Sequence, residues 1–232
     1  GNLKALFYEN RKKISFLALI VFLIFLPRIS SIYTLYLIMH ICILSIFALG
    51  FNLLLGYTGL LSFGQAGLFA AGAYACGKIL LLYPSLILGF IGAVLFSGIV
   101  SLIIGFLCVR HTRIYFSMLT LSFGMMIYSI AWKWRDVTGG DDGLVGIPRA
   151  PITIPGLIRL DMSSLENYYY FVVSISIISL YLLYRIVNSP FGLILKGIRE
   201  NEVRVLFAGV SLKKYRLLSF VIAGIYAGIA LS

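Results

Sequence analysis

Side chains that could carry out catalysis or bind a metal are few in this sequence, and they form no cluster. Cys42, Cys76 and Cys108 each stand alone in an apolar stretch, without the CxxC spacing that indicates a metal site or a disulfide framework. His40 also lies in an apolar stretch, and the predicted spans offer no acidic residue to share a proton with it. This favours a packed or interfacial histidine over a proton relay. The sequence therefore predicts no catalytic residue, no metal site and no cofactor, and we do not expect an enzyme.

The most unusual polar composition belongs to residues 50–77, which are rich in glycine. Asn52, Thr58, Ser62 and Gln65 lie among these glycines. Glycine at this density weakens a helix by up to ~1 kcal/mol per residue relative to alanine. The composition therefore predicts a break between positions 56 and 64 and a second helix from about Gln65. It does not decide whether the break is a turn at the inner surface or a re-entrant path within the membrane.

A broken helix inside a membrane frees backbone groups and a half-helix N-terminus, which are polar ligands for a substrate. The same glycines could instead serve close packing. Gly67, Ala71 and Ala75 recur every four residues, a pattern that is used between membrane helices. Both interpretations stay open, and both may hold together. On the first, we expect the substrate path to be lined by Gly56, Tyr57, Thr58, Gly59, Ser62, Gly64, Gln65 and Gly67.

Residues 188–216 form the longest polar interruption that keeps a helical pattern of its own. Apolar Phe191, Leu195 and Ile198 recur at three- and four-residue spacing, which makes one face of a short helix. Pro190 suits its first turn. A membrane protein that keeps an amphipathic helix in a loop uses it to touch a partner or the lipid surface.

A second polar loop covers residues 133–167, with the sequence TGGDDG at 138–143 and prolines at 148, 151 and 155. The two aspartates do not form an EF-hand calcium loop, because the closing glutamate is absent. We expect a structured turn that faces a partner on the outer side or covers the path. The residues of this turn are Thr138, Gly139, Gly140, Asp142 and Gly143.

Apolar blocks separate these polar segments. Hydrophobic residues make up 61% of the chain, charged residues make up 12%, and the mean hydropathy is +1.02. A soluble domain averages roughly 45–50% apolar and 25% charged residues, and a helix needs about 20 mostly apolar residues to cross a bilayer. The sequence thus predicts an all-α polytopic integral membrane protein, a single transmembrane domain over residues 1–232 with about seven or eight spans. The candidate spans are 14–26, 33–55, 64–82, 86–109, 114–132, 168–187 and 217–231. Because the last is still apolar where it stops, we expect further chain after Ser232.

The net charge of +11 follows the predicted topology. With a cytoplasmic N-terminus and one crossing per span, most of the 19 Lys and Arg residues fall on the inner side, including the 188–216 loop. Most of the 8 Asp and Glu residues fall in the outer 133–167 loop. This is the distribution that the positive-inside rule describes. The basic charge therefore indicates contact with membrane lipid and not with nucleic acid.

Three stretches, taken in order, resemble the LivM-type permease subunits of ABC importers for branched-chain amino acids. They are residues 52–73 with the Gly-rich segment, residues 113–148 with TGGDDGLVGIP, and residues 189–209 with IRENE. The resemblance implies an all-helical permease of the bacterial inner membrane that pairs with a homologous permease subunit. It also implies two cytoplasmic ATP-binding subunits and a periplasmic substrate-binding protein.

The resemblance further implies a coupling helix over residues 192–202 that docks on the ATP-binding subunits. Two departures stand out. Met125 occupies a position where the family often has glutamate, and Arg204, Val205 and Phe207 replace its usual alanines. The second departure alters the surface offered to the ATP-binding subunit. The residues that the resemblance assigns to coupling are Gly192, Arg199, Glu200, Asn201, Glu202 and Gly209.

The expected function is that of a permease subunit in an ATP-driven importer of branched-chain amino acids. The same kind of permease could carry urea or short amides, since relatives with this signature serve those solutes. An ion-coupled secondary transporter is a different class and would be expected to show acidic residues in its spans. In a structural subunit without a path, the glycines would serve packing alone. Dependence of uptake on an ATPase separates the first two classes from the last two.

Overall fold

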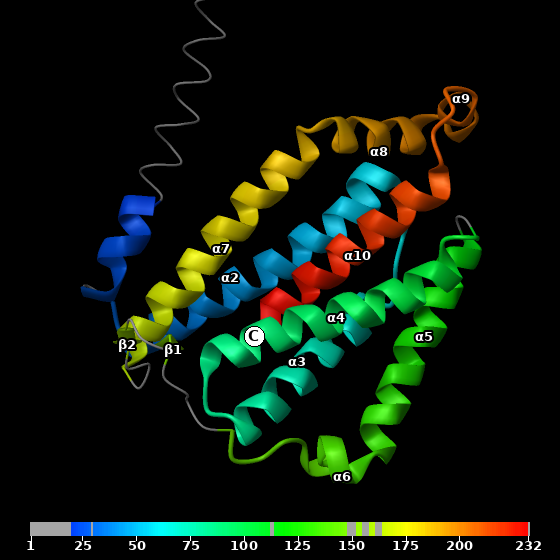
Figure 1. Ribbon diagram of the computed structural model, residues 1–232. Coiled ribbons are helices and arrows are strands. Elements are labelled where there is room, and N and C mark those ends of the chain that lie inside the picture. Colours follow the sequence, from blue (N-terminus) through cyan, green and yellow to red (C-terminus); the bar gives the residue numbers. More distant parts are fainter. Residues whose placement is uncertain are drawn as a thin grey trace, which may run out of the picture.

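Long helices make up most of the structure, as the apolar blocks of the sequence predict. The computed structural model describes residues 20–28, 30–111, 114–147, 152–154, 158–160 and 164–231. Its long helices (Figure 1) are α2 (Ile32–Asn52), α3 (Gln65–Leu82), α4 (Leu86–Cys108), α5 (Ile114–Lys133), α7 (Leu165–Val187) and α10 (Leu212–Leu231). The shorter elements are a helical turn at 20–25, η1 (Leu26–Arg28), η2 (Leu53–Thr58), α6 (Arg135–Thr138), η3 (Gly140–Asp142), β1 (Ile152–Ile154), β2 (Ile158–Leu160), α8 (Pro190–Glu200) and α9 (Glu202–Phe207).

Helix α10 lies at the centre of the bundle and contacts α2, α3 and α4, while α7 packs on α2 and α5 packs on α3 (Figure 1). Small residues let α10 come close to its neighbours. A Cβ atom on Gly72 would lie 3.0 Å from Gly228 Cα, so α3 and α10 nearly touch at the backbone. The Ser97 hydroxyl of α4 donates to the Gly224 carbonyl at 2.6 Å. Contacts between small residues and shared hydroxyls are how membrane helices associate.

Five helical stretches in the described part of the chain are long and apolar enough to cross a membrane. They are Ile32–Thr58, Gln65–Leu82, Leu86–Cys108, Ile114–Lys133 and Leu165–Val187. These match the second to sixth predicted spans. The first predicted span, 14–26, begins outside the described residues, and the last, 217–231, forms the apolar part of α10. The helical, polytopic class is confirmed, while the total of seven or eight spans stays a prediction.

One element departs from the helical pattern. Strands β1 and β2 form an antiparallel ribbon within the 133–167 loop, with Ile152 opposite Leu160 and Ile154 opposite Ile158. Both strands are rich in β-branched residues, which favour extended backbone. The ribbon lies between α6 and α7 in the sequence.

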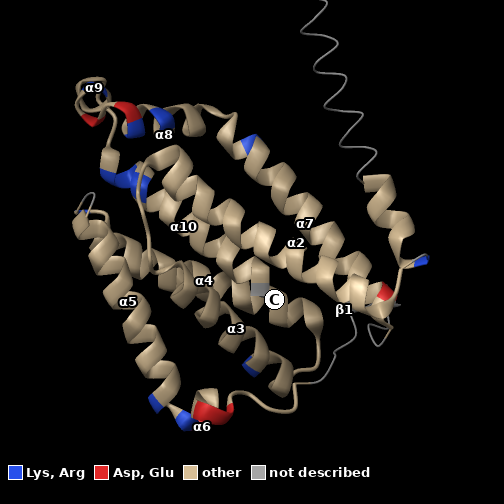
Figure 2. Ribbon diagram, turned by 180° about the vertical axis from the view of Figure 1, so that it is seen from behind, with Lys and Arg blue, Asp and Glu red and all other residues tan. Residues whose placement is uncertain are grey.

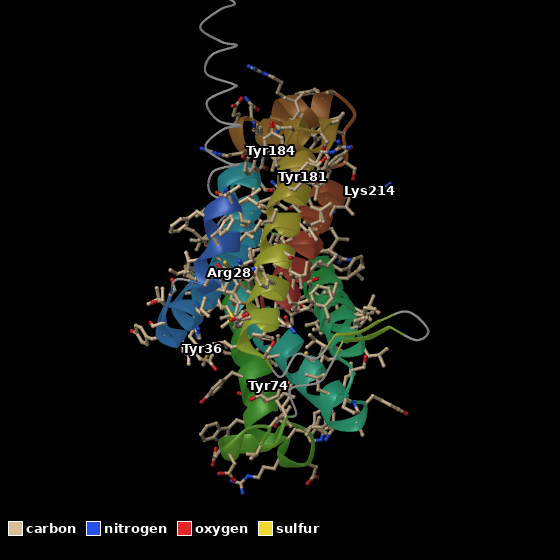
Figure 3. All side chains as sticks on the ribbon, turned by 90° about the vertical axis from the view of Figure 1, so that its left-hand side faces the viewer. Arg28, Tyr36, Tyr74, Tyr181, Tyr184 and Lys214 are labelled. Carbon is tan, nitrogen blue, oxygen red and sulfur yellow. The ribbon has the colours of Figure 1, made fainter. Side chains whose placement is uncertain are left out.

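The two polar loops lie at opposite ends of the bundle (Figure 1). Helices α8 and α9 cover one end together with the basic run at 213–216, whereas α6 and the acidic η3 lie at the other (Figure 2). Tyr181 and Tyr184 of α7 point outward near the α8 end (Figure 3), and the Arg185 guanidinium lies 6.0 Å from the Tyr181 ring. Exposed tyrosine and arginine at the end of an apolar helix are typical of the membrane–water interface.

Candidate substrate path and coupling site

The predicted break between α2 and α3 is present. Helix α2 widens into a π-helical turn, η2, which ends at Gly59 with a left-handed φ of 75°. Residues 59–64 then have no regular structure, and α3 begins at Gln65, as expected. Thr58 closes the π turn, because its hydroxyl donates to the Leu53 carbonyl at 3.1 Å. A π-helical turn inside an α-helix often marks a functional position.

The segment after the break runs into the bundle along α5. The Ser117 hydroxyl donates to Leu61 O at 2.7 Å, and Phe63 N donates to Thr120 Oγ1 at 3.2 Å. A Cβ on Gly64 would lie 2.6 Å from Thr120 O, so glycine permits this approach. Thr120 lies six residues after the first residue of α5. At ~1.5 Å per residue, the start of α3 therefore lies beside a point about 9 Å along α5. The chain therefore continues from the break into the bundle before α3 begins, while the choice between an inner turn and a re-entrant path stays a prediction.

The eight residues expected in the substrate path surround this break but fall into two groups. Gly56 and Tyr57 line an open pocket, and Gly59 is exposed beside them. The others are buried in the bundle: Thr58, Ser62, Gly64, Gln65 and Gly67. Ser62 Oγ and Gln65 Nε2 are both buried without a hydrogen-bond partner. Gly67 serves packing as well, because its Cβ would lie 3.0 Å from Gly124 Cα of α5.

Helix α8 carries the amphipathic pattern that the sequence predicts. Gly192, Leu195 and Ile198 are buried against η2 and α7, while Arg199 and Glu200 are exposed. Gly192 makes the corner between α7 and α8 possible, because a Cβ there would lie 2.0 Å from Val187 O. The apolar face thus rests on the membrane bundle, and the charged residues lie along its exposed edge.

The extent of the helix differs from the expected 192–202. Helix α8 begins at Pro190 and ends at Glu200, and Asn201 has an extended backbone with φ −155°. The Asn201 side-chain oxygen accepts a hydrogen bond from Arg204 N at 3.0 Å and caps a second helix, α9. Asparagine favours such capping positions over helix interiors. The predicted single helix is therefore two helices, with Asn201 and Glu202 starting the second and Gly209 following its end.

Helix α8 and the π turn that ends α2 are in direct contact. The Arg199 guanidinium donates to the Gly56 carbonyl in η2. A Cβ on Gly59 would lie 3.1 Å from Arg199 Cγ, so the arginine stem packs against the residue that ends the π turn. Lys196 Nζ lies 5.4 Å from the centre of the Tyr57 ring. These side chains line an open pocket of about 430 Å³ together with Asn52 and Glu200.

An ion pair ties α9 to α10. Glu202 pairs with Arg216, whose side chain is 5% exposed, whereas that of Glu202 is 43% exposed. Arg216 is read from the sequence only as part of a basic run at the membrane surface, so its burial is a finding of the structure. The one sequence signal is its position in the helix: Arg216, Ser219 and Ala223 follow each other at helical spacing on the buried side of α10. The Arg199–Gly56 hydrogen bond and the Glu202–Arg216 ion pair therefore both involve the IRENE segment, residues 198–202.

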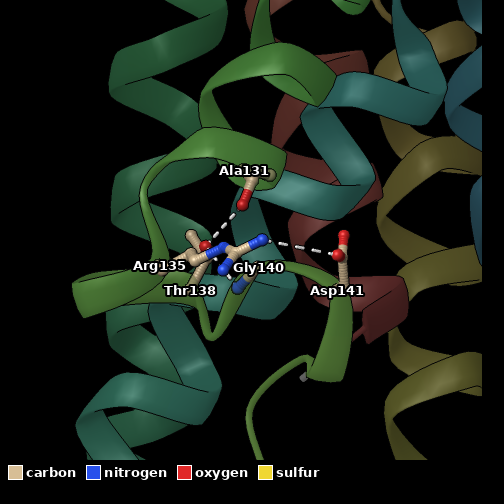
Figure 4. Close-up of polar contacts among 5 residues, drawn as sticks. All are labelled: Ala131, Arg135, Thr138, Gly140 and Asp141. Atoms are coloured by element: carbon tan, nitrogen blue, oxygen red, sulfur yellow. Dashed lines mark hydrogen bonds and ion pairs between the residues drawn. The ribbon is translucent and has the colours of Figure 1, made fainter.

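The TGGDDG segment at 138–143 forms the structured turn that the sequence predicts (Figure 4). The Thr138 hydroxyl, which is buried, donates to the carbonyls of Ala131 and Trp134 and accepts from Gly140 N at 3.3 Å. A Cβ on Gly139, which has φ 79°, would lie 2.0 Å from Gly143 O. Beside this turn, Arg135 Nη2 lies 3.6 Å from Asp141 Oδ2, while Asp142 is exposed. What faces this turn stays a prediction.

Comparison with known proteins gives two results of the same kind. The model of the family described as "Branched-chain amino acid transport system / permease component" matches residues 33–230. The chain is also 27% identical over 244 residues to the high-affinity branched-chain amino acid transport system permease protein LivM of Salmonella typhimurium, and 27% identical to that of Escherichia coli. Each alignment covers 95% of this chain and 56% of the relative, so the chain spans about half the length of these relatives. No solved structure matches this chain.

Proposed function

Because the chain belongs to the family of permease components of branched-chain amino acid transport systems, we propose that it is one permease subunit of an ATP-driven importer. The importer moves branched-chain amino acids across the bacterial inner membrane, with the α8–α9 end and the N-terminus on the cytoplasmic side. In this account the chain pairs with a homologous permease subunit. Two ATP-binding subunits dock at α8 and α9, and a periplasmic binding protein delivers the solute at the α6 end.

The observation that carries this proposal is the contact of Arg199 with Gly56. ATP is expected to bind in a separate subunit, so its energy must reach this chain as a movement of the docking helix. A short helix that is fixed to the bundle transmits a push, whereas a flexible loop would absorb it. The buried face of α8 and the Arg199 contact supply that fixation. The π turn that receives the push is the first part of the proposed path.

The near alternative is the same type of ATP-driven importer with urea or a short amide as its solute. An ion-coupled transporter is less well supported, because the described parts of the five candidate spans hold a single acidic residue. That residue is Glu166, which is exposed in the first turn of α7. Ion-coupled carriers use acidic side chains inside the membrane.

Reversing one charge on α8 tests the coupling role. Glu200 is exposed beside Arg199 and has no part in the core of the bundle. We expect Glu200→Arg to leave the protein in the membrane but to uncouple it, so that ATP hydrolysis persists while leucine uptake falls at least tenfold. Glu200→Gln keeps the size of the side chain and serves as the milder control, with a smaller loss. Normal uptake by Glu200→Arg, at equal membrane levels, would remove the coupling assignment.

A further inference from the structure

The first turn of α3 presents polar groups inside the bundle without partners of their own. Helix α3 has no side-chain cap, and the residue before it is Gly64. The first N–H groups of any helix have no carbonyl one turn earlier to accept from them. Here these groups lie below the start of α5, and Gln65 and Gly67 are buried. A helix start at such a depth normally has a partner.

Two side chains add further unpaired groups at the same place. Ser62 is 1% exposed and Gln65 is 3% exposed. Neither Ser62 Oγ nor Gln65 Nε2 has a hydrogen-bond partner. Buried polar atoms in folded proteins are almost always paired, so two unpaired ones within four residues indicate a bound molecule or a trapped water. The neighbouring hydroxyl Thr58 differs, because it donates to Leu53 O at 3.1 Å.

The electrostatics of this place favour an anion. A helix N-terminus carries roughly half a positive charge, and the amide of Gln65 adds donors to it. No acidic residue occurs in η2, in residues 59–64, in α3 or in α5, so within these described elements nothing offsets the positive end of α3. A carboxylate has two oxygens that accept from several N–H and O–H donors at once. Urea is neutral, so its carbonyl oxygen could accept from the same donors but would gain less from the positive helix end than a carboxylate does.

We propose that the first turn of α3, with Ser62 and Gln65, binds the carboxylate of the amino acid that passes through the membrane. This inference rests on the proposed function, since it names the chemical group by which the path recognises its solute. Gln65 Nε2 and the Ser62 hydroxyl donate to the carboxylate oxygens beside the free N–H groups of α3. Half-helix N-termini that point at anionic groups are a general solution for solute binding near the middle of a membrane.

The same segment is connected to the cytoplasmic end of the bundle. Residues 59–64 lead directly from η2 to α3, and η2 is held by Arg199 through Gly56. On the other side, Ser117 and Thr120 of α5 hold Leu61 and Phe63. A shift of α8 would therefore move the polypeptide that closes over the carboxylate site. Residues 59–64 thus connect the proposed carboxylate site to the helix proposed for coupling.

The test uses the whole transporter complex in detergent, without the periplasmic binding protein, so that solute binds only to the membrane part. The measured quantity is the solute concentration that gives half of the maximal rise in the thermal unfolding midpoint. Leucine is compared with leucinamide, which keeps the side chain and the ammonium group but has no carboxylate. The wild type is expected to bind leucine at least tenfold more tightly than leucinamide.

Two substitutions at Gln65 then show whether leucine binding depends on the hydrogen-bond donors of the side chain or on its volume. Gln65→Met keeps the volume and removes the donors, and leucine is expected to bind about tenfold more weakly. Gln65→Glu places a carboxylate where the solute's carboxylate should lie, and leucine binding is expected to fall about a hundredfold. The matched control is Ser122→Ala, since that exposed hydroxyl of α5 donates within its own helix to Met118 O at 3.0 Å. If Gln65→Glu does not assemble, Ser62→Ala replaces it, with an expected tenfold loss.

The outcomes distinguish this site from the proposed function. Unchanged leucine binding in the Gln65 variants, with ATP-dependent leucine uptake intact in the wild type, would mean that these groups hold a structural water only. That result would overturn the carboxylate site and leave the importer role standing. A wild-type transporter that takes up no leucine with ATP would contradict the proposed function itself, and the site with it.

Discussion

Arg216 is the clearest case in which a single residue has a role that its type alone does not suggest. An arginine near the end of a membrane helix usually reaches the lipid headgroups, but this one is buried and faces Glu202 across two helices. A buried arginine that loses its acidic partner becomes an uncompensated charge. The ion pair therefore holds α9 against α10.

Neutralising one partner of this pair is expected to cost stability. Breaking a fully buried pair costs about 3–5 kcal/mol, and because Glu202 is partly exposed we expect Glu202→Gln to cost only about 1–2 kcal/mol. The measurement is the unfolding midpoint of the purified complex, together with the leucine moved per ATP hydrolysed.

The exchanged pair, Glu202→Arg with Arg216→Glu, is the control for this prediction. It should recover part of the stability that each single substitution loses. Additive losses in the double variant would show that the two side chains do not interact, and the link between α9 and α10 would have to be sought elsewhere.

At the scale of elements, the contact between α3 and α5 decides the shape of the proposed path. Gly64 lies so close to Thr120 O that any side chain must displace one of the two segments. Enlarging a packed position costs roughly 1–3 kcal/mol, so we expect Gly64→Ala to lower the unfolding midpoint and to reduce uptake. Gly98→Ala in α4 is the matched control, because its Cβ would lie 3.5 Å from Ile225 Cγ1, an ordinary contact. Equal behaviour of the two variants would contradict the close packing of Gly64 against α5.

The sequence predicts these elements well where the signal is local. The glycines at 56, 59 and 64 weaken a helix wherever they occur, so both the break and the start of α3 at Gln65 follow from composition. The depth of α3 does not follow, because it depends on the approach of Gly64 to Thr120, 56 positions apart in the sequence. The end of α8 was misplaced by two residues for a different reason. Asn201 can continue a helix or cap the next one, and its bond to Arg204 N decides for capping.

Contacts between distant segments account for the rest of what the sequence does not reveal. The Arg199 bond to Gly56 joins residues 143 positions apart, and the two belong to stretches that sequence reasoning assigned to separate tasks. Ser62 and Gln65 were expected in the path, but their lack of partners is visible only once their neighbours are in place. The residue types predicted the segments that form the break and the amphipathic helix, and only the structure shows the contacts between them.

At the scale of the whole molecule, the bundle has one end built around α8 and α9 and another built around α6 and η3 (Figures 1 and 2). Residues 59–64 start at the first end and lead into the interior, where α10 packs against α2, α3 and α4. This arrangement would give the proposed ATP-binding subunit and the proposed solute-binding protein separate surfaces. We propose that movement of α8, driven by the ATP-binding subunits, moves solute past the break.

The most direct measurement is solute uptake into vesicles that hold this chain with its partner permease, ATP-binding subunits and binding protein. Labelled leucine and labelled urea are compared with and without ATP on the cytoplasmic side, and with and without an ion gradient. We predict leucine uptake that requires ATP and is indifferent to the gradient, whereas ATP-dependent uptake of urea alone would keep the machine and change its solute. Leucine uptake that follows an ion gradient and ignores ATP would contradict the account.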